Sequence, residues 1–247
     1  MDIGMNGKRV VVTAGAQGIG LAITGAFVAA GAQVHICDIN ENFLAAAKAK
    51  FPAVSQSRTD VADEAQVDVM FAELGKRWGG LDVLVNNAGI AGPTAKVEDT
   101  DLTEWSQTIA VNLTGPFLCT RRAVPLLKAA GGGSIVNLSS IAGRLGFPLR
   151  TPYSASKYGV IGLTETWAME LGPSHIRVNA ILPGLTDTKF ASALTQNPAV
   201  LKSIMPMIAL NRMAQPVEIA PIALYLASNA SSYVTGASHA VDGGFLA

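Results

Sequence analysis

A strand, a glycine-rich turn and a helix follow one another near the N-terminus, and this order strongly restricts the fold. The run Arg9-Val-Val-Val-Thr13 is β-branched and lacks polar alternation, as expected for a strand buried on both faces. The turn Ala14-Gly-Ala-Gln-Gly-Ile-Gly20 follows at once, and residues 21–30 are expected to form a helix. A second strand at Gln33-Val-His-Ile-Cys37 closes on Asp38. This βαβ unit predicts parallel strands that are covered by helices.

The alternation of strands and helices continues to the C-terminus. Further strands are expected at residues 53–59, 81–85, 134–138, 177–182 and 237–241, and further helices at 41–50, 63–78, 102–130, 151–171 and 216–227. Pro116 and Pro125 are expected to break or bend the long helix. The sequence therefore predicts one α/β domain over residues 1–247, a doubly wound, Rossmann-like, seven-stranded parallel sheet with helices on both faces.

Composition limits the partners of such a domain. Eighteen basic residues balance eighteen acidic ones, so bulk charge favours neither nucleic acid nor an anionic membrane. The absence of a long apolar run and of a signal pattern in residues 1–8 predicts no membrane span and a cytoplasmic location. Cys37 and Cys119 lack metal-ligand spacing and are expected to be free thiols in a reducing cytosol. Charged residues are only 15% of the chain, which suggests that an oligomer buries part of its surface.

Each of six candidate binding or catalytic motifs lies directly after a predicted strand. Ligands of parallel α/β sheets bind outside the carboxyl ends of the strands, so these motifs are predicted to meet in one crevice. The segments concerned are residues 14–20, 38, 60–61, 86–89, 139–140 and 183–188.

The glycine turn and Asp38 together favour a dinucleotide. Gly15, Gly18 and Gly20 would let a phosphate approach the backbone at a helix N-terminus, although a tight turn could need glycine for its shape alone. Asp38 can accept hydrogen bonds from ribose hydroxyls and repels a 2′-phosphate, which argues for NAD(H). Gln17 is neutral and no cationic residue occupies 37–40. The alternative is that Asp38 is a capping or solvated residue.

Tyr153 and Lys157 are predicted to lie one turn apart on the same face of a helix. An ammonium at that distance can lower the pKa of a phenol, and such a tyrosine can exchange protons near neutral pH. The alternative is a tyrosine packed on the stem of a surface lysine.

In their order along the chain, these residues resemble the short-chain dehydrogenase/reductase family in its form of about 250 residues. The resemblance covers essentially the whole chain. It rests on Thr13–Gly20, Asp60-Val61, Asn86-Asn-Ala-Gly89, Asn112, Ser140, Tyr153-x-x-x-Lys157, Pro183-Gly184 and Asp242-Gly-Gly244.

The resemblance implies catalytic roles. Tyr153 would be the general acid/base, and Lys157 would lower its pKa and bond the nicotinamide ribose. Ser140, rather than its neighbour Ser139, would position the substrate oxygen. Asn112 would hold a water that links Lys157 to solvent. The implied reaction interconverts a secondary alcohol and a ketone, with hydride transfer to or from NAD.

The resemblance also implies the cofactor contacts. The family usually has glycine where this chain has Ala14, so either the turn accepts an ordinary residue there or cofactor affinity suffers. A substrate lid is implied at about residues 187–210. The expected NAD-binding residues are Gly15, Gln17, Gly18, Ile19, Gly20, Asp38, Asp60, Val61, Asn87, Ala88, Gly89, Tyr153, Lys157, Pro183, Gly184, Thr186 and Thr188.

The hypothesis for the substrate is a small polar molecule, acidic or sugar-derived. Arg144 and Arg150 lie between Ser140 and Tyr153, where a guanidinium could clasp a carboxylate, although a surface or interface ion pair explains them as well. No metal is expected, and no role is assigned to a histidine. Further candidates for the pocket wall are Thr94, Phe147 and Phe190.

Two other functions stay open. A 3-oxoacyl-carrier-protein reductase would normally use NADPH, and Asp38 argues against this cofactor. It would also need a basic surface for docking the carrier protein, for which Arg121-Arg122 is a small candidate. A non-catalytic NAD-binding regulatory protein would not need the intact catalytic set. The family implies a homotetramer, with the helices near 101–129 and 151–172 forming one interface.

Overall fold

Seven parallel strands form the sheet at the centre of the protein. The computed structural model describes residues 3–191 and 198–247. The sheet has the order β3-β2-β1-β4-β5-β6-β7, and every neighbouring pair is parallel, as predicted. The strand order reverses between β1 and β4, where a crevice forms at the strand ends. The strands are β1 (Arg9–Thr13), β2 (Gln33–Asp38), β3 (Ser55–Arg58), β4 (Val83–Asn86), β5 (Gly133–Leu138), β6 (Ile176–Pro183) and β7 (Ser238–Val241).

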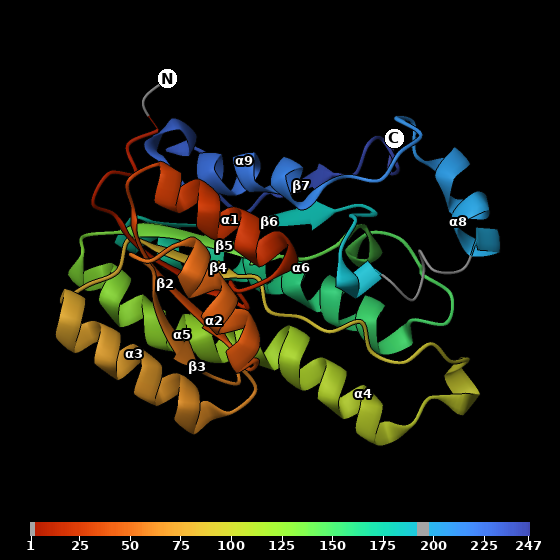
Figure 1. Cartoon of the computed structure of the whole chain (residues 1–247), viewed down its shortest axis with the longest axis horizontal. Coiled ribbons are helices and arrows are strands. Elements are labelled where there is room, and N and C mark those ends of the chain that lie inside the picture. The colour runs from red at the N-terminus through yellow and green to blue at the C-terminus, as the bar shows by residue number, and fades with distance from the viewer. Residues whose placement is uncertain (1–2, 192–197) are drawn as a thin grey trace.

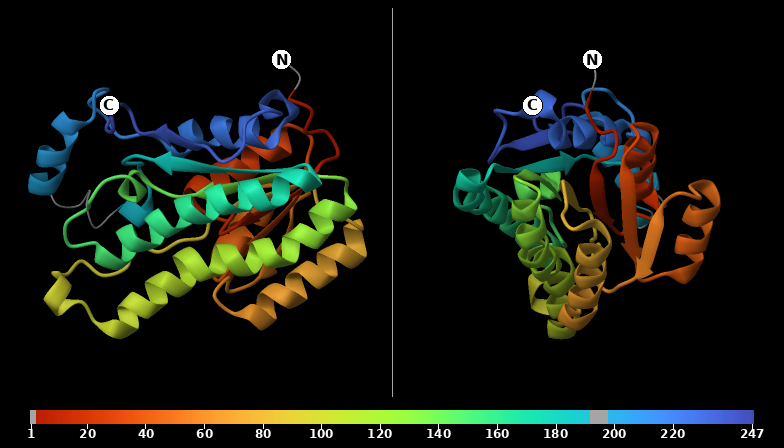
Figure 2. Two further views of the ribbon diagram at one scale, coloured as in Figure 1. Left: turned by 180° about the vertical axis from the view of Figure 1, so that it is seen from behind. Right: turned by 90° about the vertical axis from the view of Figure 1, so that its left-hand side faces the viewer.

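Helices cover both faces of the sheet (Figures 1 and 2). One layer contains α1 (Gly18–Ala29), α2 (Glu41–Lys50) and α9 (Pro216–Ala227), and the other contains α3 (Glu64–Trp78), α5 (Gly115–Ala129) and α6 (Thr151–Leu171). Strand β1 supplies both cores, because successive side chains of a strand point to opposite faces. Val10 and Val12 pack in the core beneath α1 and α9, whereas Val11 packs in the core beneath α3 and α5.

The helices begin where the sequence provides caps. The side chain of Asn40 accepts hydrogen bonds from two backbone N–H groups of α2, and that of Asp63 accepts one from α3. Pro216 occupies the first turn of α9. Helix α1 starts at Gly18, three residues earlier than expected, because the end of the glycine turn is itself the first helical turn.

The long helix after β4 contains a π-helical segment. Helix α4 (Leu102–Ile109) continues into η2 (Ala110–Thr114), which is π-helical, and then into α5. In an α-helix the N–H of residue 116 would bond the carbonyl of Asn112, and Pro116 has no N–H to give. Of the break or bend expected at Pro125, no break occurs, because Pro125 lies inside α5 without ending it. The irregularity therefore falls around Asn112.

Short helical pieces and loops connect the main elements of the described chain. The region predicted as a substrate lid contains three of them, and its residues 192–197 lie outside the described residues. Among the residues described, no helix is both long and apolar enough to span a bilayer. The pieces are η1 (Val97–Asp99), η3 (Ile141–Gly143), η4 (Gly172–Ser174), η5 (Lys189–Ala191), α8 (Pro198–Ile204), η6 (Met205–Met207) and η7 (Asn229–Ser231).

A buried amide network connects the sheet to the helices beneath it. The Asn86 Nδ2 atom donates to Asn137 Oδ1 at 2.9 Å and to Thr120 Oγ1 at 3.1 Å. The Asn137 Nδ2 atom donates to Thr164 Oγ1 at 2.9 Å. These four side chains are fully or almost fully buried, and they join β4 and β5 to α5 and α6. The network therefore holds α6 in place against the sheet.

Replacing Asn137 with leucine should destabilise the protein, because the Asn86 amide loses its acceptor in the buried network. We expect Asn137→Leu to lower the free energy of unfolding by about 2 kcal/mol, measured by chemical denaturation at a fixed protein concentration. The matched control is Asn42→Leu on the exposed face of α2, which should change it by less than about 0.5 kcal/mol. Equal losses in the two variants would show that the network contributes nothing.

Candidate active site

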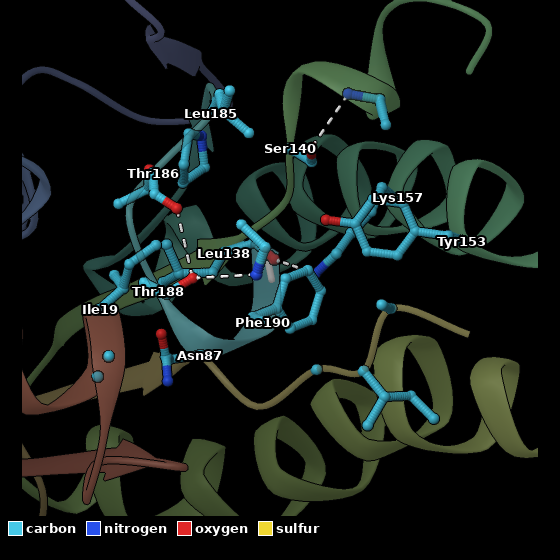
Figure 3. Close-up of a pocket in the computed structure, with 18 of the residues that line it drawn as sticks. Ile19, Asn87, Leu138, Ser140, Tyr153, Lys157, Leu185, Thr186, Thr188 and Phe190 are labelled. Atoms are coloured by element: carbon cyan, nitrogen blue, oxygen red, sulfur yellow. Dashed lines mark hydrogen bonds between the residues drawn. The ribbon is translucent and has the colours of Figure 1, made fainter. Parts of the chain in front are cut away.

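A cavity of about 930 Å³ lies at the carboxyl ends of the central strands. The segments after β1, β4, β5 and β6 all contribute to its wall, together with the first turns of α6. Figure 3 shows Ser140, Tyr153 and Lys157 on one side of this cavity, with Thr188 and Phe190 facing them. Four of the six predicted strand-end segments, residues 14–20, 86–89, 139–140 and 183–188, therefore meet in one crevice, whereas Asp38 and residues 60–61 lie outside its wall.

Ser140, Tyr153 and Lys157 come from two neighbouring elements. Ser140 follows β5 and caps the single turn η3, where its Oγ accepts a hydrogen bond from Ala142 N at 3.1 Å. Tyr153 and Lys157 lie one turn apart on α6 and both line the cavity. The Lys157 ammonium donates to Leu138 O at 2.8 Å and lies 5.7 Å from the centre of the Tyr153 ring. The three side chains thus surround one small volume.

Burial controls the protonation of this group. Burial raises the pKa of Tyr153 above its usual value, and the Ser140 hydroxyl and the Arg150 guanidinium each partly lower it. Burial lowers the pKa of Lys157 to about 8. The expected lowering of the Tyr153 pKa by Lys157 does not appear, because the ammonium bonds Leu138 O and lies beside the ring rather than at the phenol oxygen. In this state Tyr153 is a neutral phenol at pH 7.

Asn112 and Ser139 both bond to the backbone around the site. Asn112 Oδ1 accepts from Ile90 N at 2.7 Å, and its Nδ2 donates to Ile90 O at 2.9 Å and to Ser156 Oγ at 3.1 Å. Its side chain is therefore occupied, and any water that it holds must be bound by its main chain. The Ser139 hydroxyl donates to Lys157 O at 2.8 Å. Ser139 thus anchors α6, which leaves Ser140 as the hydroxyl that faces Tyr153.

The glycine turn can hold a phosphate only because its residues are small. A Cβ atom at Gly20 would lie 2.2 Å from Ala14 O and 2.5 Å from Asn87 Nδ2, so no larger residue fits there. Asn87 Nδ2 donates to Thr13 O at 2.9 Å and to Ala14 O at 3.1 Å, which ties the turn to the end of β4. Gly18 has φ +53° and begins α1, whose free N–H groups point to the cavity end of the helix.

Ala14 adopts φ +47°, in the left-handed region that favours glycine. Alanine is therefore present in the turn, but in a backbone conformation that is unfavourable for any residue with a Cβ atom. The protein tolerates the alanine at the cost of backbone strain of about 1 kcal/mol.

Asp38 at the end of β2 has an unsatisfied acceptor. Its Oδ1 accepts from Asn40 N at 3.0 Å, whereas its buried Oδ2 has no hydrogen-bond partner among the described residues. Burial raises the pKa of this carboxyl, and backbone N–H groups, that of Ala16 among them, partly lower it. A buried carboxylate oxygen without a donor fits a ribose hydroxyl better than it fits a capping role.

Most of the predicted site residues line the cavity, but some do not. Asp60 accepts from Ala62 N and Val61 packs against the start of α5, so neither reaches the cavity wall. The lining includes Gln17, Gly18, Ile19, Gly20, Asn87, Gly89, Ser140, Tyr153, Lys157, Pro183, Gly184, Thr186 and Thr188, and it leaves out Gly15, Asp38, Asp60, Val61, Ala88 and Asn112.

The residues predicted to contact the substrate fall into two groups, those that line the cavity and those that lie outside it. Arg150, Phe147 and Phe190 line the cavity, and the Phe190 ring lies 5.9 Å from that of Tyr153. Arg144 is exposed and its Nη2 donates to Ser238 O at 3.0 Å, away from the lining. Thr94 is exposed and is also outside it.

Several apolar residues of the wall carried no signal in the sequence. They lie in loops and in the short helical pieces η3 and α8, where neither periodicity nor a motif separates a pocket residue from a surface one. They are Ile90, Ala91, Ile141, Ala142, Leu185, Ile204 and Phe245, and Phe43 and Lys189 were also not predicted. No group of three or more His, Cys, Asp or Glu side chains suited to a metal ion occurs in residues 3–191 and 198–247.

Comparison with known proteins identifies similar chains over nearly the full length. A family model described as enoyl-(acyl carrier protein) reductase matches residues 13–246. The chain is 43% identical over 242 residues to a 3-alpha-(or 20-beta)-hydroxysteroid dehydrogenase of Mycobacterium bovis, covering 98% of this chain and 90% of the relative. It is 42% identical over 247 residues to a trans-4-hydroxycyclohexanecarboxylate dehydrogenase of Sinomonas cyclohexanicum, covering 96% and 92%.

A solved structure is similar as well. A gluconate 5-dehydrogenase from Burkholderia cenocepacia J2315, in complex with NADP and tartrate, superposes with a TM-score of 0.93 at 32% identity. The match covers 98% of this chain and 96% of that one.

Replacing Ala14 with glycine should stabilise the protein, because glycine relieves the strain at φ +47°. The relief exceeds the extra entropy that glycine gives the unfolded chain, so we expect Ala14→Gly to raise the free energy of unfolding by about 0.5–1 kcal/mol. Ala46→Gly, at an exposed position inside α2, should instead lower it by about 1 kcal/mol. A loss at position 14 as large as that at position 46 would contradict the strain.

Proposed function

The chain belongs to the short-chain dehydrogenase/reductase family, and we propose that this oxidoreductase of CH–OH groups uses NAD(H) to interconvert a secondary alcohol and a ketone on a small ring that carries an acidic group. The observation that carries the proposal is the meeting of Ser140, Tyr153 and Lys157 in the wall of one cavity. The named relatives are dehydrogenases of hydroxyl compounds, which supports the reaction class.

The residues of the site have distinct tasks in this reaction. When bound, the nicotinamide supplies the hydride acceptor or donor. In reduction the neutral Tyr153 phenol gives its proton to the reacting oxygen. In oxidation the residue must first lose that proton, and its phenolate then takes the proton of the alcohol. The Ser140 hydroxyl hydrogen-bonds the reacting oxygen as charge develops on it. Lys157, held by Leu138 O, keeps a positive charge beside the phenol and is placed to bond the nicotinamide ribose.

The donor set of the nucleotide half fits NAD(H). The buried Asp38 Oδ2 offers an acceptor to ribose hydroxyls and would repel a 2′-phosphate. Gly18 keeps the N-terminus of α1 open to a pyrophosphate, and Gly20 lets the turn pack closely against Asn87. The similar gluconate 5-dehydrogenase holds NADP, so the preference of this chain rests on Asp38 and requires measurement.

The wall of the cavity favours a ring with an apolar body. The cavity wall contains the apolar side chains of Ile90, Ile141, Phe147, Leu185 and Phe190, the last beside Tyr153, and these cannot bond the hydroxyl groups of a polyhydroxylated sugar. The names of the two relatives at 42–43% identity describe alcohols with a carbocyclic body, a hydroxysteroid and a hydroxycyclohexanecarboxylate. An acidic ring alcohol therefore fits the cavity better than a sugar acid.

A panel of alcohols with NAD⁺ tests the proposal through the formation of NADH. We expect oxidation of cyclic secondary alcohols, 4-hydroxycyclohexanecarboxylate among them, to exceed that of gluconate. Tyr153→Phe should lower kcat about a thousandfold, because the proton acceptor is removed. Tyr233→Phe, at a fully exposed tyrosine, should leave kcat unchanged.

The same panel separates the alternatives. Faster turnover with NADP⁺ than with NAD⁺ would show that the cofactor assignment is wrong. Reduction of a 3-oxoacyl-carrier-protein substrate in preference to every ring ketone would identify the chain as a carrier-protein reductase. Binding of NADH without turnover of any alcohol would support a regulatory protein.

We also propose that the enzyme is a cytoplasmic homotetramer. Leu102, Phe117 and Tyr158 expose large apolar side chains on α4, α5 and α6, the helices expected to form one interface. The buried free thiols Cys37 and Cys119 suit a reducing compartment.

Charging the helical face should separate the subunits, because it places an ion in an apolar contact. We expect Phe117→Glu to sediment as a smaller species than the wild-type protein, whose mass should be four times 25.5 kDa. Val69→Glu, on the exposed face of α3 outside the expected interface, is the control and should leave the mass unchanged. A fully active wild-type monomer would contradict the tetramer.

A further inference from the structure

Arg150 is a buried cation without an acidic partner. Only 6% of the residue is exposed, and it forms no ion pair with any residue that the structure describes. Its protein contacts are two long hydrogen bonds from Nη1, to Ala91 O and to Gly92 O, both at 3.3 Å. No acceptor in the described chain forms a hydrogen bond with Nε or Nη2 of Arg150. A guanidinium stays protonated in proteins, so this charge remains even though burial lowers the pKa of Arg150.

A second buried arginine shows what a structural role looks like in the same fold. Arg177 on β6 donates from Nη1 to Leu226 O at 2.8 Å and to Ser231 Oγ at 2.7 Å, and from Nη2 to Ser228 O at 3.0 Å. Both of its terminal nitrogens are therefore bonded at short distance. Arg177 does not line the cavity, whereas Arg150 does. The loosely bonded arginine is the one that faces the binding space.

The surroundings of Arg150 favour an anion. It precedes α6, a helix of 21 residues, so it lies at the positive end of that helix dipole. No Asp or Glu side chain occurs among the described residues that line the cavity. A buried charge without a partner is unfavourable, and a carboxylate from the substrate would supply both the counter-charge and acceptors for the free nitrogens.

We propose that Arg150 binds the carboxylate of an alicyclic hydroxy acid while Ser140 and Tyr153 hold its carbinol oxygen. Arg150 and Tyr153 lie three residues apart, on the same side at the start of α6, so one small molecule can span both. The apolar side chains Ile141 and Phe147 lie in the same wall and would contact the ring between the two polar ends. This assignment rests on the proposed function for the identity of the reacting end.

The first experiment measures binding without turnover. Cyclohexanecarboxylate and its neutral amide, cyclohexanecarboxamide, are titrated by calorimetry into the protein saturated with NADH. We expect the wild-type protein to prefer the acid, and Arg150→Met to reduce that preference by about 30- to 100-fold, as for a hydrogen-bonded charge pair. Arg150→Lys should recover part of the preference, because it restores the charge without the bidentate fork.

The second experiment compares kcat/KM for 4-hydroxycyclohexanecarboxylate with that for its carboxamide. The ratio is taken within each variant. A general loss of kcat/KM that follows from removing the bonds to Ala91 and Gly92 affects both substrates and therefore cancels. We expect the ratio to fall about 30- to 100-fold in Arg150→Met, mainly through KM. Arg144→Met, at the exposed arginine outside the cavity, should leave the ratio unchanged.

The outcomes separate this inference from the proposed function. Equal binding of acid and amide by the wild-type protein, or an unchanged preference in Arg150→Met, overturns the role of Arg150 even if ring alcohols are oxidised. Arg150-dependent binding of the acid without oxidation of any alcohol would support the anion site and refute the proposed reaction.

Discussion

The buried amide of Asn137 is the contact on which the geometry of the site most depends. It accepts from Asn86 on the neighbouring strand and donates to Thr164 on α6. Helix α6 also carries Tyr153 and Lys157, so the position of the reactive phenol is set from inside the core, far from solvent. Such a buried polar network is directional, whereas apolar packing alone would allow the helix to slide. Ser139, which bonds Lys157 O, fixes the same helix at the cavity end.

The burial of this rigid helix also shifts the pKa values of Tyr153 and Lys157. Tyr153 and Lys157 are held in a dry wall, where burial raises the pKa of the phenol and lowers that of the ammonium to about 8. Both shifts favour the neutral forms, so the protein must provide compensating contacts. Ser140 and Arg150 provide them for Tyr153, and Leu138 O provides one for Lys157. The π-helical segment contributes in another way, since it brings the Asn112 side chain to Ile90 and Ser156 and so joins the loop after β4 to α6.

The sequence predicted the central strands β1 and β4 well because burial on both faces leaves a plain signal, a continuous apolar run that ends at a turn rich in small residues. It placed α6 from Thr151 to Leu171 correctly for a similar reason, a proline at the first turn and a regular interior. It could not decide between Arg144 and Arg150, because both lie in the irregular segment between η3 and α6. Only tertiary contacts direct one outward and the other into the cavity. The sequence marked Ala14 as unusual but could not show its backbone conformation, because the positive φ is imposed by the folded turn.

The positive charge around the cavity favours negatively charged groups on both the cofactor and the substrate. Arg150, Lys157 and Lys189 are the cations among its described lining residues, which contain no carboxylate. Lys189 lies 5.3 Å from the Phe43 ring, so the segment after β6 reaches across to α2, while Phe190 on the same segment contacts Tyr153. A cavity built in this way has a positive potential that attracts anions into a low-dielectric space. Because the chain as a whole is neutral, this field is local, and it favours a site whose cofactor and substrate both bring negative charge.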